Sequence, residues 1–184
     1  MKTLIFGGQS SSNREWVNAL VKQLSAQGGD YVSLCHEYLA WSSKTNSDDV
    51  SQIELEIENA QAKYRDCNFD MIIGKSFGCL MAVESKINSE YIVLIGPPVL
   101  ALKELHFDLM KAIKLSSSKI LIMMNADDPL VERADLEAYV RENPSKVILH
   151  ILSGNHHKYE DINTYASIID CFLNQKQVRL TIGR

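Results

Sequence analysis

No apolar stretch of the sequence approaches the roughly 20 residues that a membrane-spanning helix needs. The apolar run near the start, residues 3–8, is also too short for the core of a secretory signal peptide, and it ends in two glycines. We therefore expect a cytoplasmic protein that has no membrane partner.

Cysteine is sparse, with four residues and no C-x-x-C pair among them. Because Cys35, Cys67, Cys79 and Cys171 are widely spaced, and because the expected compartment is reducing, the pattern favours free thiols over disulfides. Zinc sites draw on cysteine and histidine ligands at short spacings. The cysteines do not offer such a spacing, and the one adjacent histidine pair has no third ligand nearby in the sequence, so we expect no metal ion.

An excess of positive charge is also missing. The formal net charge is -4, and there is no run of lysine and arginine. Proteins that bind nucleic acid need a basic patch to meet the phosphates, so we expect no nucleic acid partner. The 46% of hydrophobic and 23% of charged residues are ordinary globular values. A chain of 184 residues suits a single domain over 1–184, in which 175–184 form a polar C-terminal tail.

Short apolar runs alternate with longer amphipathic stretches along the chain. The expected strands are at residues 3–7, 30–35, 69–74, 91–95, 119–124 and 146–152. The expected helices are at residues 13–27, 49–65, 77–87, 103–114, 133–142 and 161–174. Nearly continuous apolar runs are typical of strands buried on both faces of a parallel sheet. The alternation predicts a three-layer α/β/α sandwich around a six-stranded, mainly parallel sheet.

The first candidate for a functional residue follows the third strand. Ligands of such sheets bind at the carboxyl ends of the strands, and there the sequence Gly74-Lys75-Ser76-Phe77-Gly78 forms a G-x-S-x-G motif between a strand and a helix. Glycines on both sides of the serine let strand and helix pass closely, so that the hydroxyl projects from the turn. The plainer interpretation is a serine that caps the helix between packing glycines. The strand–motif–helix context favours a nucleophile.

Two later loops carry the partners that a serine nucleophile needs. A serine hydroxyl reacts poorly until a base takes its proton and a third group orients that base. Asp127 and Asp128 follow the fifth strand, and His156 and His157 follow the sixth. Aspartates that only form a turn, and a surface histidine pair without a task, are the alternatives. The order Ser, Asp, His, each after a strand, favours a proton relay.

Taken together, these loops resemble those of the α/β-hydrolase superfamily, over almost the whole chain. The chain resembles the small, cap-less branch of the superfamily and is similar to the YqiA-type esterases. The segment after its fourth strand is too short for an inserted lid. It implies a minimal α/β-hydrolase fold without a lid domain and an open, shallow site. The sequence D-P-L-V at 128–131 resembles the family's acid loop, which implies Asp128 rather than Asp127 as the catalytic acid.

The histidine loop resembles the family's G-x-x-H-x-aromatic pattern across residues 154–159. That alignment implies His157 as the base and Tyr159 as the aromatic residue. An alignment on G-N-H would make His156 the base instead. Both histidines therefore stay candidates at this point.

The loop after the first strand has a second expected role. In the family this loop supplies one backbone N–H of the oxyanion hole, and the residue after the serine supplies the other. The resemblance implies Gln9 and Phe77 as these donors. Many relatives carry His-Gly where this chain has Gly7-Gly8, a departure that leaves the backbone donor in place.

The predicted function is that of a serine hydrolase, most specifically a carboxylesterase. It would act on small or short-chain acyl esters through an acyl-enzyme, with a small-molecule acyl substrate as its partner and with no cofactor. Two alternatives come from other classes. One is a binding protein on a hydrolase fold without turnover. The other is a flavodoxin-like FMN-binding protein, since residues 5–13 resemble a hydroxyl-rich phosphate loop before a helix.

Overall fold

The computed structural model describes residues 1–27, 31–39 and 50–181, with the side chains of 175–181 left out. Its strands are β1 (Lys2–Phe6), β2 (Val32–Cys35), β3 (Phe69–Lys75), β4 (Ser89–Ile95), β5 (Lys119–Asn125) and β6 (Val147–Leu152). Its helices are α1 (Asn13–Ala26), α2 (Val50–Tyr64), α3 (Gly78–Glu84), α4 (Val99–Glu104), α5 (Leu109–Leu115), α6 (Arg133–Glu142) and α7 (Ile162–Thr181).

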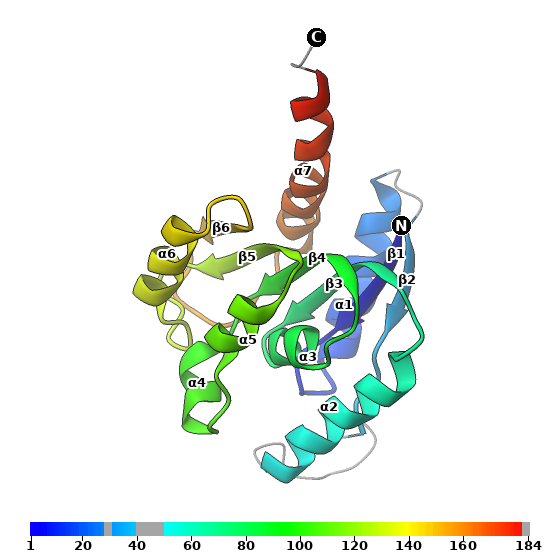
Figure 1. The fold of residues 1–184 in the computed structure, drawn as a ribbon, viewed down its shortest axis with the longest axis vertical. Helices are drawn as coiled ribbons and strands as arrows, with labels where there is room; N and C mark the ends of the chain where they lie inside the picture. Colours follow the sequence, from blue (N-terminus) through cyan, green and yellow to red (C-terminus); the bar gives the residue numbers. More distant parts are fainter. Residues whose placement is uncertain (28–30, 40–49, 182–184) are drawn as a thin grey trace.

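The six strands form one parallel sheet in the order β2-β1-β3-β4-β5-β6. The order reverses at β1, which lies between β2 and β3. The chain thus winds outward in both directions, and crossover helices cover both faces (Figure 1). The prediction of a six-stranded parallel sheet between two helical layers is confirmed. The carboxyl ends of β1 and β3 are neighbours at the switch point.

Each face of the sheet has its own apolar layer. Helices α1 and α7 pack on one face, where Val17, Leu20 and Ile169 meet the side chains of β1, β3 and β4. Helices α2 to α6 cover the other face, where Leu80 and Leu136 are fully buried (Figure 1). The central strands β3, β4 and β5 are buried on both sides, which explains their continuous apolar sequences.

The helix expected at 103–114 is wrong in its bounds, because two short helices stand there. His106 has a φ of 65°, a left-handed conformation that ends α4. The N–H of Phe107 bonds to the carbonyl of Leu102 and the N–H of His106 to that of Lys103, a Schellman motif. The Asp108 side chain then accepts from the N–H of Lys111 and starts α5. Glycine is the usual residue at a helix end of this kind, so the histidine at position 106 did not indicate that the helix ends there.

The last helix is longer than expected. The prediction ended it at residue 174, whereas α7 continues to Thr181 and includes most of the segment expected as a polar tail. In Figure 1 this end of α7 projects from the body of the molecule. Residues 30 and 49, which began a predicted strand and a predicted helix, lie outside the described residues.

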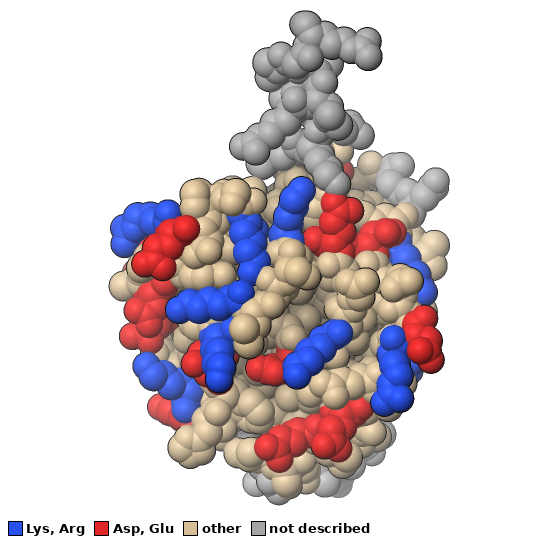
Figure 2. Space-filling model, in the orientation of Figure 1, with Lys and Arg blue, Asp and Glu red and all other residues tan. Residues whose placement is uncertain are grey.

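The surface carries charges of both signs. On the face shown in Figure 2, lysines and arginines are interspersed with aspartates and glutamates over the described residues. Within the described ranges, none of the helices combines the length and the apolar character that crossing a bilayer requires.

Candidate active site

Ser76 occupies the sharp turn between β3 and α3. Its φ is 54°, a left-handed conformation that is uncommon for a non-glycine residue. The N–H of Ser76 bonds to the carbonyl of Ile95 at 2.8 Å, which ties the turn to the end of β4. Ser76 is only partly buried. The strained turn thus places its hydroxyl at the carboxyl edge of the sheet, where it can be reached.

The glycines around Ser76 are required by close backbone approaches. A Cβ on Gly78 would lie 2.1 Å from the carbonyl oxygen of Phe6, and one on Gly74 would lie 2.3 Å from that of Gly78. Side chains at these positions would therefore push β1, β3 and α3 apart. The glycines of the motif let the loop after β1 lie directly beside the serine turn.

This packing predicts a large effect on stability. Gly78→Ala should lower the free energy of unfolding by about 3 kcal/mol or more, because the clash is with rigid backbone. Gly8→Ala is the matched control. The three atoms nearest its Cβ all belong to the Asn13 side chain, the closest at 2.7 Å, and a side chain can shift more cheaply than backbone even though Asn13 also bonds to Lys75, so the loss should be smaller. Urea denaturation of both variants measures the difference, and equal losses would contradict this account.

His157 lies between Ser76 and Asp128. Its Nε2 is 2.8 Å from Ser76 Oγ, and its Nδ1 is 2.8 Å from Asp128 Oδ2 and 3.1 Å from Oδ1. Since the carboxylate can only accept, Nδ1 carries the proton, which leaves Nε2 free to accept from the serine hydroxyl. His157 is about one-fifth exposed, so the ring can meet a substrate.

His156 points elsewhere. Its Nδ1 accepts from the N–H of Lys158 at 3.2 Å, its side chain is exposed, and its carbonyl accepts from Asn125 Nδ2 at 2.8 Å. The structure therefore brings His157, and not His156, to Ser76. Asn125 holds the histidine loop by this bond.

Asp128 is buried and fully bonded. Its carboxylate has no exposed surface and accepts from His157, from the N–H of Leu130 at 2.9 Å and from the hydroxyl of Tyr159 at 2.5 Å. Three donors thus satisfy a carboxylate that would be costly to bury without hydrogen-bond partners. Asp127, the alternative, is exposed, and its N–H bonds to the carbonyl of Gly154.

The segments that carry the expected oxyanion donors lie side by side. Phe77 caps α3 directly after Ser76, and Gln9 is in the loop after β1, which touches α3 at Gly78. Tyr38 joins the two segments. Its hydroxyl donates to the carbonyl of Gly7 at 2.8 Å, and its ring lies 5.9 Å from that of Phe77.

Sequence reasoning missed Tyr38 and Asn125. Tyr38 comes from the stretch after β2 and reaches the loop after β1 only through the fold, so no local pattern marks it. Asn125 ends β5 next to the predicted acid loop, which was a usable signal. Tyr159 was recognised as the aromatic of its loop, without a role.

Lys75, inside the motif, has a partner outside it. Its Nζ lies 2.7 Å from Asn13 Oδ1 and 5.7 Å from the centre of the Trp16 ring, and burial lowers the pKa of Lys75. Trp16 in turn donates through Nε1 to the carbonyl of Tyr159. Lys75 thus ties the serine turn to α1 and, through Trp16, to the histidine loop.

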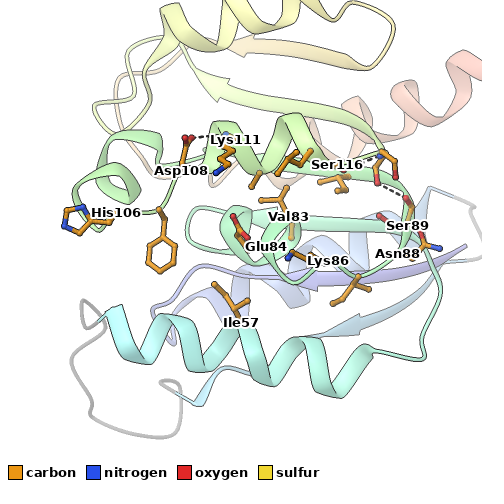
Figure 3. Close-up of a pocket in the computed structure, with 18 residues that line it drawn as sticks. Ile57, Val83, Glu84, Lys86, Asn88, Ser89, His106, Asp108, Lys111 and Ser116 are labelled. Carbon is orange, nitrogen blue, oxygen red and sulfur yellow. Dashed lines mark hydrogen bonds between the residues drawn. The ribbon is translucent and has the colours of Figure 1, made fainter.

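A groove of about 670 Å³ lies away from these residues, between α3 and α5 (Figure 3). It is lined by Asn88 and Ser89 at the start of β4, by Lys86, and by Asp108 and Lys111 of the α5 turn. One end of the groove, at Asn88, Ser89 and Ser116, lies beside the amino ends of β4 and β5. Ser76, His157 and Asp128 do not line it, so it is not the candidate site.

The structure of this chain is similar to several solved structures. No protein-family model matches the chain, and neither does the sequence of any curated protein. An esterase from Pyrococcus furiosus superposes with a TM-score of 0.72 at 17% identity, covering 95% of this chain and 81% of that one. The esterase domain of a Rhodothermus marinus protein gives a TM-score of 0.64 at 14% identity, covering 95% and 86%.

A third similar structure is of a protein about as long as this chain. It is a protein from Xanthomonas campestris pv. campestris, assigned to the α/β superfamily of hydrolases, with a TM-score of 0.63 at 18% identity. The alignment covers 95% of this chain and 98% of that one. The fold of this chain is therefore the α/β-hydrolase fold. It is a minimal form, in which the segment between β4 and β5 holds only the short helices α4 and α5.

Proposed function

We propose that this protein is a serine hydrolase, and more specifically a carboxylesterase for small or short-chain acyl esters. One observation carries the proposal: Ser76, His157 and Asp128 form a continuous chain of hydrogen bonds at the carboxyl edge of the sheet. The three residue types, their order and their distances fit general-base activation of a serine. The esterases among the structural matches add weight to this class of reaction.

In the proposed mechanism, Ser76 Oγ attacks the acyl carbon of an ester while its proton moves to His157 Nε2. Asp128 holds the imidazole in the required tautomer and stabilises the imidazolium. The negative charge on the former carbonyl oxygen is met by the backbone N–H groups of Gln9 and Phe77.

The tetrahedral intermediate then collapses. His157 Nε2–H gives its proton to the departing alkoxide, the C–O bond to the alcohol breaks, and Ser76 is left acylated. Water attacks this acyl-enzyme with His157 again as base, which releases the carboxylic acid and restores the serine. Every proton is carried by His157, so no cofactor is required in this scheme.

A fluorophosphonate probe tests the nucleophile directly. We expect the wild-type protein to be labelled at one site, to lose hydrolysis of p-nitrophenyl butyrate in proportion, and to carry the adduct on the peptide that contains Ser76. Ser76→Ala should remain unlabelled. A binding protein on the same fold would not react, and labelling at a different serine would refute the assignment. A purified protein with a flavin spectrum would instead support the flavodoxin-like alternative.

The cysteines suit an intracellular setting for this activity. All four are free, and Cys79 is buried beneath the serine turn, where its thiol donates to the carbonyl of Gly74 at 3.3 Å. Free thiols persist where the surroundings are reducing. We therefore propose the cytoplasm as the site of action.

A further inference from the structure

Tyr159 bonds to the end of the hydrogen-bond chain that lies farthest from Ser76. Its hydroxyl donates to Asp128 Oδ2 at 2.5 Å and accepts from the backbone N–H of Asn125 at 3.1 Å. A distance of 2.5 Å is typical of an O–H donor on a carboxylate, which is among the stronger kinds of hydrogen bond. Tyr159 is 1% exposed, so bulk water does not compete for this side of Asp128.

The ring of Tyr159 is fixed by its surroundings. It meets the His157 ring edge-on, with centroids 5.6 Å apart, and it lies 6.0 Å from the ring of Tyr165. Gly96 makes room for it: this residue has a φ of 59°, and a Cβ there would lie 2.1 Å from Tyr159 Cε2. The hydroxyl therefore has one position available, against Asp128.

The phenol also stays protonated. Burial raises the pKa of Tyr159 far above its ordinary value, and the hydrogen bond to Asp128 raises it further. The titratable groups near it include Cys79, whose pKa is raised by burial, Tyr165, which lies near Asp161 and Glu160, and Lys75, which lies over the Trp16 ring. Tyr159 is thus a permanent donor to the carboxylate.

We propose that Tyr159 is a positioning residue of the site, which holds the Asp128 carboxylate and limits how strongly it stabilises the His157 imidazolium. Oδ2 is shared between the phenol and the imidazole Nδ1. A donor on that oxygen withdraws electron density from it, so the carboxylate attracts the imidazolium less strongly. The residue adjusts the base through Asp128 and does not touch the substrate. This inference rests on the proposed hydrolase function.

Tyr159→Phe removes the hydroxyl and keeps the ring. We expect kcat for p-nitrophenyl butyrate to fall about 10- to 100-fold, because an Asp128 carboxylate that is no longer held in place orients the His157 ring less well, with KM changed by less than about twofold. The acidic limb of the kcat/KM profile should move to higher pH, because Asp128 without this donor favours the protonated histidine. Tyr165→Phe, the matched control, should leave both the rate and the limb unchanged.

Fluorinated tyrosine at position 159 gives the opposite change in a side chain that is only slightly larger. Fluorine makes the phenol a stronger donor, so the acidic limb should move to lower pH. A role in packing alone moves the limb in neither variant, and that result would overturn the inference. If Tyr159→Phe does not fold, the fluorotyrosine protein still decides, because it keeps the hydroxyl that bonds to Asp128.

The two proposals fail in different ways. A wild-type protein without esterase activity and without fluorophosphonate labelling would remove the proposed function, and this inference with it. A wild-type enzyme that loses activity in Ser76→Ala but shows a native rate and pH profile in Tyr159→Phe would remove the inference alone.

Discussion

Replacement of Ser76 by alanine is expected to lower kcat/KM for p-nitrophenyl butyrate by about 10⁴-fold or more, which is the scale seen when a serine nucleophile is removed. The physical reason is that no other described group takes its place. The His157 ring that accepts its hydrogen bond at 2.8 Å would then face a methyl group. Initial rates over a range of substrate concentrations measure the loss.

The fold should survive this change. Alanine is smaller than serine, and Ser76 is only partly buried, so neither a clash nor a large cavity is created. Circular dichroism and the thermal midpoint of Ser76→Ala are therefore expected to match the wild type. Activity that persists in a folded, homogeneous Ser76→Ala protein would show that the reaction uses a different group.

The second large effect separates the two adjacent histidines. His157→Ala should lower kcat/KM by about 10³-fold or more, because it removes the base and leaves Asp128 without its partner. His156→Ala, its matched control one residue away, should stay within about twofold of wild type, since this exposed ring bonds only to the N–H of Lys158. Steady-state kinetics on both variants decide between them.

Reversed results would be informative. If His156→Ala abolished activity and His157→Ala did not, the loop after β6 would have to rearrange on binding substrate, and the assignment of the base would be wrong. Equal losses in both variants would indicate that the loop, held by Asn125 through the carbonyl of His156, had collapsed. Fluorophosphonate labelling of the folded variants would distinguish these cases.

The strands of the sheet could be predicted from the sequence because the central ones are buried on both faces. A run such as residues 119–124 has few alternatives to a buried parallel strand, and all six expected strands are present. The helix ends were harder to predict. His106, which has a left-handed conformation, separates α4 from α5, and no glycine in the sequence marks this helix end. Turn conformations of this kind depend on packing around the turn.

For the candidate site, local motifs identified the residues that follow strands. The G-x-S-x-G motif indicated Ser76, and the acid and histidine loops indicated Asp128 and His157, which the structure brings together. The supporting residues were not visible in the same way. The bond from Tyr38 to Gly7 joins positions 31 residues apart, and only the completed sheet brings them into contact.

The distance along the chain between Ser76 and His157, 81 residues, has a consequence for biosynthesis. His157 arrives only after β6 has added to the edge of β5, so a chain still emerging from the ribosome carries the serine turn without its base. Because domains fold as units, we expect the growing polypeptide to lack the proposed activity until β6 and the histidine loop have been made and have packed against β5. A chain that ends before β6 would lack His157, so we expect it not to have the proposed activity.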